Sequence, residues 1–227
     1  SYDDVTQRMI LANDATVLSD NRELFGDNIN IQFSDSLMSS INVTGNAKAH
    51  NIIYAKINKN SIEKKKFIDI MLGNNIDVNF ENDEITDIVL DRMASTMYHA
   101  IDSTLLIGMN SVNGDLINLG FENDELYTIK VIGDARGEFY PELGNSKIDS
   151  TIIYKSEEID YFIDTQESYL NDLGEIKYQN MILQANYIHV DWNQNILNAT
   201  KKYNKLPSVT TYGGDPMEGD SLRYNLL

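Results

Sequence analysis

Side chains that could perform catalysis or hold a metal are few and scattered in this sequence. Its three histidines, His50, His99 and His189, lie far apart along the chain, and no two have the spacing that would place both on one face of a helix. Cysteine, a common zinc ligand and nucleophile, is absent. Neither a glycine-rich phosphate-binding loop nor a G-x-S-x-G nucleophile turn occurs. The sequence therefore predicts no catalytic residues, no metal site and no cofactor.

Charged clusters are the remaining candidates for chemistry. The acidic runs Glu81–Asp87 and Glu122–Glu125 lack the alternating carboxylates, central glycine and distal glutamate of a calcium loop, so we interpret them as solvated turns and helix caps. We interpret the single basic run, Lys64–Lys66, as the solvated face of a helix. Because 35 acidic residues always allow some carboxylate pair in space, a hydrolase that uses two carboxylates stays open as an alternative.

The charge balance limits the partners. Lys and Arg total 18 against 35 Asp and Glu, and the resulting net charge of −17 disfavours adhesion to nucleic acid phosphates. An acidic surface could repel DNA that moves past it, or it could simply serve solubility. No stretch of about 18 apolar residues occurs, so no membrane span and no membrane partner are expected. The polar start of the chain and the absence of cysteine predict synthesis in the cytoplasm.

Local patterns indicate a mixture of helices and strands. Acidic residues beside an apolar face predict a first helix from Asp3 to about Ser19, and capping residues at Asn60 and Asn82 predict helices over 61–72 and 83–108. The expected fold class is α+β with antiparallel sheet elements, in one domain over residues 1–204 that could divide near 150–156. Alternating apolar residues predict strands over 28–33, 37–43, 51–57, 76–80, 115–121, 126–132 and 150–155.

The strongest periodicity is a seam of side chains at alternating steps of four and three residues in the C-terminal third. It predicts a long antiparallel helical hairpin over residues 156–203 that turns at Gly174. A strand competes with the second helix over Asn186–Trp192, where apolar residues also alternate. The seam residues are Ile159, Ile163, Leu170, Leu173, Ile182, Trp192 and Ile196.

Two segments are candidates for contacts with other molecules. Residues 205–227 contain prolines and glycines and show no periodicity, which predicts an extended C-terminal arm that packs on its own domain or on a neighbouring subunit. The glycine-rich loop around Arg136 could bind a carboxylate of a neighbour. The predicted interaction residues are Arg136, Tyr212, Met217, Leu222, Tyr224 and Leu226.

One short sequence occurs twice. Phe80–Glu84 and Phe121–Glu125 both read FENDE, and each is followed by an apolar run. A duplicated unit is conceivable. Because the first copy leads into a helix pattern and the second into a strand pattern, we favour a coincidence in a chain rich in Asn, Asp and Glu.

The start of the chain, Ser1-Tyr2-Asp3-Asp4-Val5 followed by Met9 and Ile10, resembles the first helix of head–tail connector proteins of tailed bacteriophages. The resemblance implies a homo-oligomeric ring around a DNA channel, with the C-terminal arm bound to a neighbouring virion protein and DNA passing an acidic lumen without adhering. The strand content leaves other tail or capsid-associated roles open.

We therefore predict a non-enzymatic structural subunit of a virion, made in the host cytoplasm. Two alternatives of other classes remain. One is a soluble acidic hydrolase that uses carboxylates, and the other is an acidic inhibitor that mimics nucleic acid.

Overall fold

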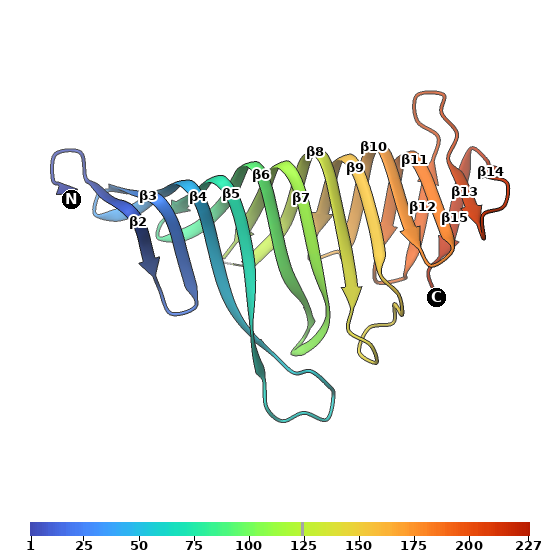
Figure 1. The fold of residues 1–227 in the computed structure, drawn as a ribbon, viewed down its shortest axis with the longest axis horizontal. Helices are drawn as coiled ribbons and strands as arrows, with labels where there is room; N and C mark the ends of the chain where they lie inside the picture. The colour runs from blue at the N-terminus through green and yellow to red at the C-terminus, as the bar shows by residue number, and fades with distance from the viewer. Residues whose placement is uncertain (124) are drawn as a thin grey trace.

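A computed structural model describes residues 1–123 and 125–227, and over these residues it contains fifteen strands and no helix. All strands belong to one antiparallel sheet in which neighbours in sequence are neighbours in space from β1 to β12, with β15 next to β12 (Figure 1). β13 pairs with β11, and β14 pairs with β13. The strands are β1 (Tyr2–Asp3), β2 (Arg8–Leu18), β3 (Arg22–Ser34), β4 (Leu37–Ala55), β5 (Lys65–Glu81), β6 (Glu84–Asp102), β7 (Leu105–Glu122), β8 (Glu125–Pro141), β9 (Ile152–Phe162), β10 (Glu167–Tyr178), β11 (Met181–Asp191), β12 (Ile196–Thr200), β13 (Ser208–Thr211), β14 (Met217–Glu218) and β15 (Ser221–Asn225).

Most strands are bent in the middle by a break in the ladder. Register shifts interrupt the pairing near the centre of each pair from β2–β3 to β10–β11. On the even-numbered strands each break contains two successive residues with positive φ, a backbone that redirects a strand. These pairs are Asn13-Asp14, Gly45-Asn46, Arg92-Met93, Gly133-Asp134 and Asp172-Leu173.

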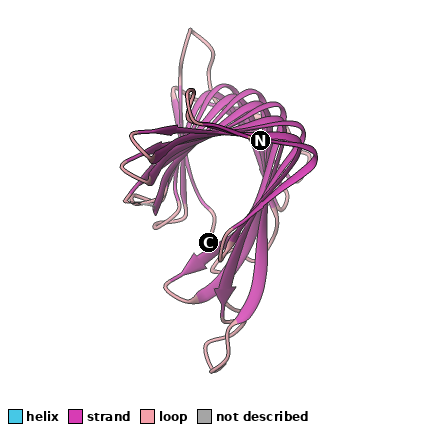
Figure 2. Ribbon diagram, turned by 90° about the vertical axis from the view of Figure 1, so that its left-hand side faces the viewer, coloured by secondary structure: helices cyan, strands magenta, loops and turns pink. Residues whose placement is uncertain are grey.

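The aligned breaks form a corner that runs the length of the molecule and divides the sheet into two walls. Figure 2 shows the result from one end, an arch of strands that is open on one side. We call the side with the short turns β3–β4, β5–β6 and β7–β8 wall A, and the other side wall B. Wall A comprises residues 8–12, 28–44, 75–91, 116–132, 158–171, 187–200 and 221–225, and wall B comprises residues 15–26, 47–73, 94–113, 135–156, 174–185 and 208–211.

The hydrophobic core lies between the walls, next to the corner. Alternate side chains of both walls point inward and form one buried cluster, in which Ile76 and Ile117 of wall A and Ala94 and Ala135 of wall B are at most 1% exposed. Small residues of wall B thus lie in the same cluster as large aliphatic residues of wall A. Burial of these apolar side chains supplies the main favourable term in folding.

The predicted helix over 83–108 is wrong, because this segment forms β6 and β7. The corner explains the misleading pattern. Leu90 and Ala94 are both buried and four residues apart because the break between them adds residues to the alternation. Ile85 and Ile88 are three apart because a second irregularity follows the turn. Steps of three and four are what a helix produces, so a strand with two breaks imitates one.

The other predicted helices are also wrong, and with them the α+β fold class. The segment expected to form the first helix contains β1 and β2, and residues 61–72 form the end of a loop and the start of β5. The hairpin over 156–203 is replaced by β9 to β12, and the strand that competed over Asn186–Trp192 is part of β11. Gly174 lies at the corner in β10, and the chain turns at residues 179–180 instead.

The seam residues therefore do not lie on one face. Ile159 and Leu170 are cross-strand partners and are buried. Leu173 and Ile182 point outward and are 57% and 37% exposed. Trp192 is half-buried just after the last residue of β11, Ile163 lies in the β9–β10 turn, and Ile196 is half-buried on β12.

The FENDE repeat is a structural repeat. The first copy forms the β5–β6 turn, and the described residues of the second copy lie at the end of β7 and the start of β8, also on wall A. Asn82 and Asp83 both have positive φ, as required at the two central residues of a type I′ turn. Asn123 has positive φ in the second copy, and Asp124 lies outside the described residues. The expectation that the first copy leads into a helix is wrong, because β6 follows the first copy and β8 follows the second.

The C-terminal segment joins the sheet. β13 pairs with β11 on wall B, and β15 pairs with β12 on wall A. Leu226 is buried, and Leu222 and Tyr224 pack against the core. Tyr212 and Met217 are 87% and 58% exposed. The domain boundary at residue 204 stays a prediction.

A substitution at the corner tests its backbone geometry. Gly133 has φ of +80°, and a Cβ built there would lie 2.8 Å from the Cβ of Asp115. We expect Gly133→Ala to destabilise the protein by about 1 kcal/mol, because alanine is strained at this φ. Urea denaturation measures the effect, and the control is Gly214→Ala, where φ is not positive and the nearest atom is 3.3 Å away. Equal effects of the two substitutions would contradict the assignment of the corner.

Candidate ligand-binding face

The inner face of wall A becomes more exposed toward the open side of the arch. Along β5, Ile76 is 0% and Val78 4% exposed, whereas Phe80 at the end of the strand is half-buried. Along β7 the same order is Ile117, Leu119 and Phe121. The core is therefore closed to solvent at the corner and accessible at the strand ends on the open side of the arch. We call the row of strand ends and turns along the open side of each wall its rim.

Aromatic residues occupy the rim position on alternate strands. β3, β5, β7 and β9 each carry one half-buried ring, and a fifth ring directly follows the last residue of β11. All five pack against the core from the inner face. Strands in a sheet are about 4.8 Å apart, so the row spans roughly 40 Å across β3 to β11. We call these residues the aromatic row, and they are Phe33, Phe80, Phe121, Tyr161 and Trp192.

The sequence reasoning did not identify this row, apart from Trp192, which it assigned to a helix. A signal was present. Phe80 and Phe121 are the first residues of the FENDE repeat, and Phe33 stands two residues before the turn residues Asp35 and Ser36, which also have positive φ. An aromatic residue before a turn of Asn, Asp or Ser is therefore the repeating unit of the rim.

The inner face of wall B carries hydroxyl and amide groups. Tyr154 Oη donates to Asn110 Oδ1 at 2.8 Å, and Asn110 Nδ2 donates to Tyr98 Oη at 2.8 Å. Burial raises the pKa of both tyrosines well above the ordinary value of 10. The Tyr161 hydroxyl of wall A acts electrostatically on both of them. These three polar residues are on the inner face of wall B, whereas the aromatic row is on the inner face of wall A.

A second polar group lies nearby on wall B. The Asp69 carboxylate is buried and accepts hydrogen bonds from the backbone N–H of His99 at 2.9 Å and from Asn51 Nδ2 at 3.3 Å. The His99 Nδ1 lies 2.9 Å from the same carboxylate. The backbone pairing of β5 with β6 ends at Ile70 and Met97. Beyond this point the Asp69 carboxylate accepts the hydrogen bond of the His99 backbone N–H in place of a backbone carbonyl of β5. These contacts give Asp69 and His99 a structural role.

The remaining histidines and charged runs form no reactive cluster. His50 and His189 lie beside Glu23 and Glu167 at 2.9 and 3.1 Å, far from each other in the sheet. Over residues 1–123 and 125–227 no group of three or more His, Asp or Glu side chains is placed to hold a metal ion. The described chain also has no helix long and apolar enough to span a membrane.

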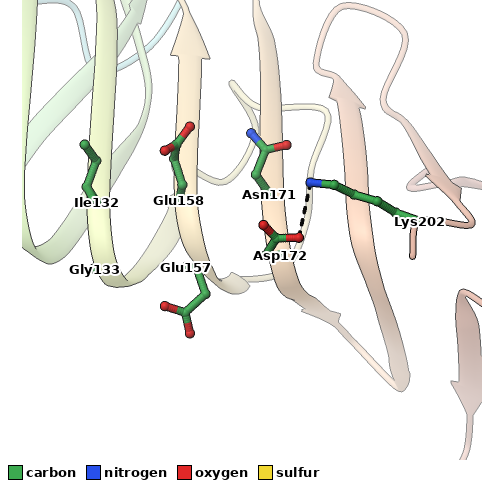
Figure 3. Close-up of a pocket in the computed structure, with 7 residues that line it drawn as sticks. All are labelled: Ile132, Gly133, Glu157, Glu158, Asn171, Asp172 and Lys202. Atoms are coloured by element: carbon green, nitrogen blue, oxygen red, sulfur yellow. Dashed lines mark ion pairs between the residues drawn. The ribbon is translucent and has the colours of Figure 1, made fainter. Parts of the chain in front are cut away.

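The outer side of the corner contains a hollow of about 520 Å³ (Figure 3). Lys202 Nζ forms an ion pair with Asp172 at 3.2 Å there, and hydrogen bonding to Asp172 raises the pKa of Lys202. Lys130 neutralises Glu158 at 2.8 Å. Glu157 points away from this group in Figure 3. The hollow is lined by Ile132, Gly133, Glu157, Glu158, Asn171, Asp172 and Lys202.

The predicted interaction residues are spread over the molecule. Arg136 lies just after the corner in β8 and makes three hydrogen bonds to the Asp134 carboxylate at 2.8–3.1 Å. Leu222, Tyr224 and Leu226 come together with the core, while Tyr212 and Met217 lie apart on the surface. That these residues bind a partner stays a prediction.

Comparisons with known proteins give limited information. No protein-family model and no curated protein matches the chain. One similar solved structure is LptH of Pseudomonas aeruginosa, the LptA-homologous periplasmic component of a lipopolysaccharide transport device. It has 14% sequence identity and a TM-score of 0.44, over 64% of this chain and 88% of that chain.

The resemblance to phage connector proteins is wrong. It depended on a helix at the start of the chain, and the structure has β1 and β2 there instead. The predictions of a virion subunit, of a ring with virion neighbours around DNA, and of a location in the virion are corrected with it.

Proposed function

We propose that the protein is a non-enzymatic binding protein that holds an elongated apolar chain, such as the acyl chain of a lipid, along the inner face of its arch. The observation that carries this proposal is the aromatic row. Large rings that are only half-buried leave apolar surface in contact with water at the rim, and contiguous apolar surface of this kind typically marks a binding site.

The shape of the row favours an extended ligand over a compact one. The rings follow one another across the strands for roughly 40 Å, and buried aliphatic side chains lie behind each of them. A flexible hydrocarbon chain that lies along the row would cover several rings at once. Its transfer from water would gain about 0.8 kcal/mol for each buried CH₂ group.

Polar groups on wall B could bind the polar end of an amphipathic molecule whose hydrocarbon chain lies along the aromatic row. Tyr98 accepts a hydrogen bond from Asn110, so its own hydroxyl proton is not used in that contact and can be donated to a ligand. A neutral donor inside an apolar face recognises a carbonyl or ester oxygen. The inner face thus offers hydrocarbon contacts on wall A and a hydrogen-bond donor on wall B.

The test is binding of a fluorescent fatty acid whose emission rises in an apolar environment. We expect saturable binding by the full chain and a loss of about tenfold or more in affinity for Phe121→Ser, because one ring contact on burial corresponds to about 1.5–3 kcal/mol. The matched control is Phe162→Ser at the same rim, because Phe162 is 40% exposed and points to the outer face.

Two results would refute the proposal. One is the absence of saturable binding by a wild-type protein that shows a cooperative melt. The other is an equal loss of affinity for Phe121→Ser and Phe162→Ser. Phe80→Ser, which alters the same row on β5, provides a second variant if Phe121→Ser does not fold.

A further inference from the structure

The loop between β4 and β5 collects positive charge in a strongly acidic protein. Residues 54–68 contain five lysines and one acidic residue, Glu63, although the whole chain has a net charge of −17. Figure 1 shows this loop extending beyond the end of the sheet. The five lysines are Lys56, Lys59, Lys64, Lys65 and Lys66.

These five lysines form no ion pairs among the described residues, in contrast to other lysines of the chain. Lys130, Lys155, Lys177, Lys201 and Lys202 each form an ion pair with a carboxylate. Over the described residues no ion pair involves any of the five lysines of residues 54–68, and all of them except Lys56 are exposed. Within residues 1–123 and 125–227 no carboxylate forms an ion pair with them, so their charge is available to a partner.

Exposed apolar side chains stand among the lysines. Ile62 in the loop is 92% exposed, Tyr54 at the end of β4 is 51% exposed and Ile68 on β5 is 37% exposed. Tyr54 lies opposite Lys66, and Ile52 lies opposite Ile68, in the β4–β5 ladder. Tyr54 and Ile68 point to the outer face of wall B, because Ala55 and Asp69 beside them are buried on the inner face.

We infer that this patch, Tyr54, Ile62, Ile68 and the five lysines, docks the protein on the surface of an anionic lipid bilayer. Lysines gain electrostatic attraction from acidic headgroups, and aromatic and aliphatic side chains beside them enter the headgroup region. An acidic protein would attract the lysines equally, but it does not account for an isoleucine that is 92% exposed at the centre of the lysine run.

The described turns of wall A carry no lysine or arginine. The turns of wall A carry acidic residues at Asp35, Asp83, Glu84 and Asp164, and an anionic surface repels them. The lysine patch lies at the rim of wall B. Contact with a bilayer through this patch therefore brings the open side of the arch near the lipids while wall A stays in solution.

The experiment is co-sedimentation of the full chain with vesicles of phosphatidylcholine alone and of phosphatidylcholine mixed with phosphatidylglycerol. We expect binding to the mixed vesicles only, and less of it as salt rises. The triple substitution K64Q/K65Q/K66Q should lower the partition coefficient roughly a hundredfold, because each lysine near an anionic surface contributes about a factor of five. Ile62→Ser should lower it by a smaller factor at unchanged charge.

The matched control is K201Q/K205Q/R223Q, which removes the same charge at exposed positions outside the patch. Equal binding to both kinds of vesicle, equal loss in both triple variants, or no binding to mixed vesicles would overturn the inference. If the protein binds polyglutamate as tightly as it binds the mixed vesicles, and if Ile62→Ser does not change the affinity for polyglutamate, the partner of the patch is an acidic protein instead. The fatty-acid probe separates the two proposals, since K64Q/K65Q/K66Q leaves the aromatic row intact and should bind it as wild type does.

Discussion

Ile117→Asp is expected to leave the protein unfolded at room temperature, while Asn118→Asp, one position further along β7, folds normally. Ile117 is 0% exposed and lies between Leu90 and Val131 on the inner face of wall A. An aspartate there would place an unpaired carboxylate among aliphatic side chains, which costs several kcal/mol, and it would also lose the burial of isoleucine. The total approaches or exceeds the stability of a typical domain.

The neighbouring position is the control because strand residues alternate between faces. Asn118 lies opposite Lys130 on the outer face of β8, so an aspartate there meets a positive charge and water. Far-UV circular dichroism of the two purified variants measures the outcome. If the Ile117→Asp variant melts cooperatively at the same temperature as the wild-type protein, the packing of the two walls is not as described.

Alternation predicted several strands correctly as local elements. Residues 28–33, 37–43, 126–132 and 150–155 each read as alternating apolar positions, and each falls largely within a strand of the structure. The alternation is visible because one face of these segments is buried and the other is polar. The same polar outer face occurs on β5 and β6 of wall A, where Asn79 Nδ2 donates to Asp87 Oδ2 at 2.7 Å.

The breaks that form the corner could not be predicted from the sequence. Gly45-Asn46 and Gly133-Asp134 are residue types that favour positive φ, but Arg92-Met93 and Leu173 are not. Tertiary packing imposes the backbone at those positions, so local propensity offers no warning. The break then shifts the apolar spacing from two to four and suggests a helix, which accounts for the predicted helix over 83–108 and the seam around Leu170, Leu173 and Gly174.

Gly137 shows the same limit for the candidate site. In the sequence it belongs to a glycine-containing stretch that reads as an exposed loop, yet it lies in β8 beneath the Tyr154 ring. A Cβ at this position would come within 2.4 Å of that ring, so glycine is required for Tyr154 to reach Asn110. A contact between residues on different strands leaves no local pattern, and the polar groups of wall B were missed for this reason.

The protein is expected to lose stability steeply above pH 10, because burial raises the pKa of Tyr98 and Tyr154 well above the ordinary value. Below pH 10 both tyrosines are protonated in the folded and the unfolded chain, so their burial has no pH-dependent effect. Above pH 10 only the unfolded chain releases these protons, which favours unfolding by about 1.4 kcal/mol per pH unit for each tyrosine. The two together remove roughly 3 kcal/mol per unit until the pH reaches their folded pKa.

Urea denaturation at a series of pH values from neutral to strongly alkaline measures this slope. Tyr154→Phe should be less stable at neutral pH, because it leaves Asn110 Oδ1 without its donor, but its stability should fall less steeply above pH 10. Tyr212→Phe is the control, since Tyr212 is 87% exposed and removing its hydroxyl should change neither value. An identical alkaline slope in wild type and Tyr154→Phe would mean that the Tyr154 hydroxyl reaches water in the folded protein, and the polar chain on wall B would then lie outside the core.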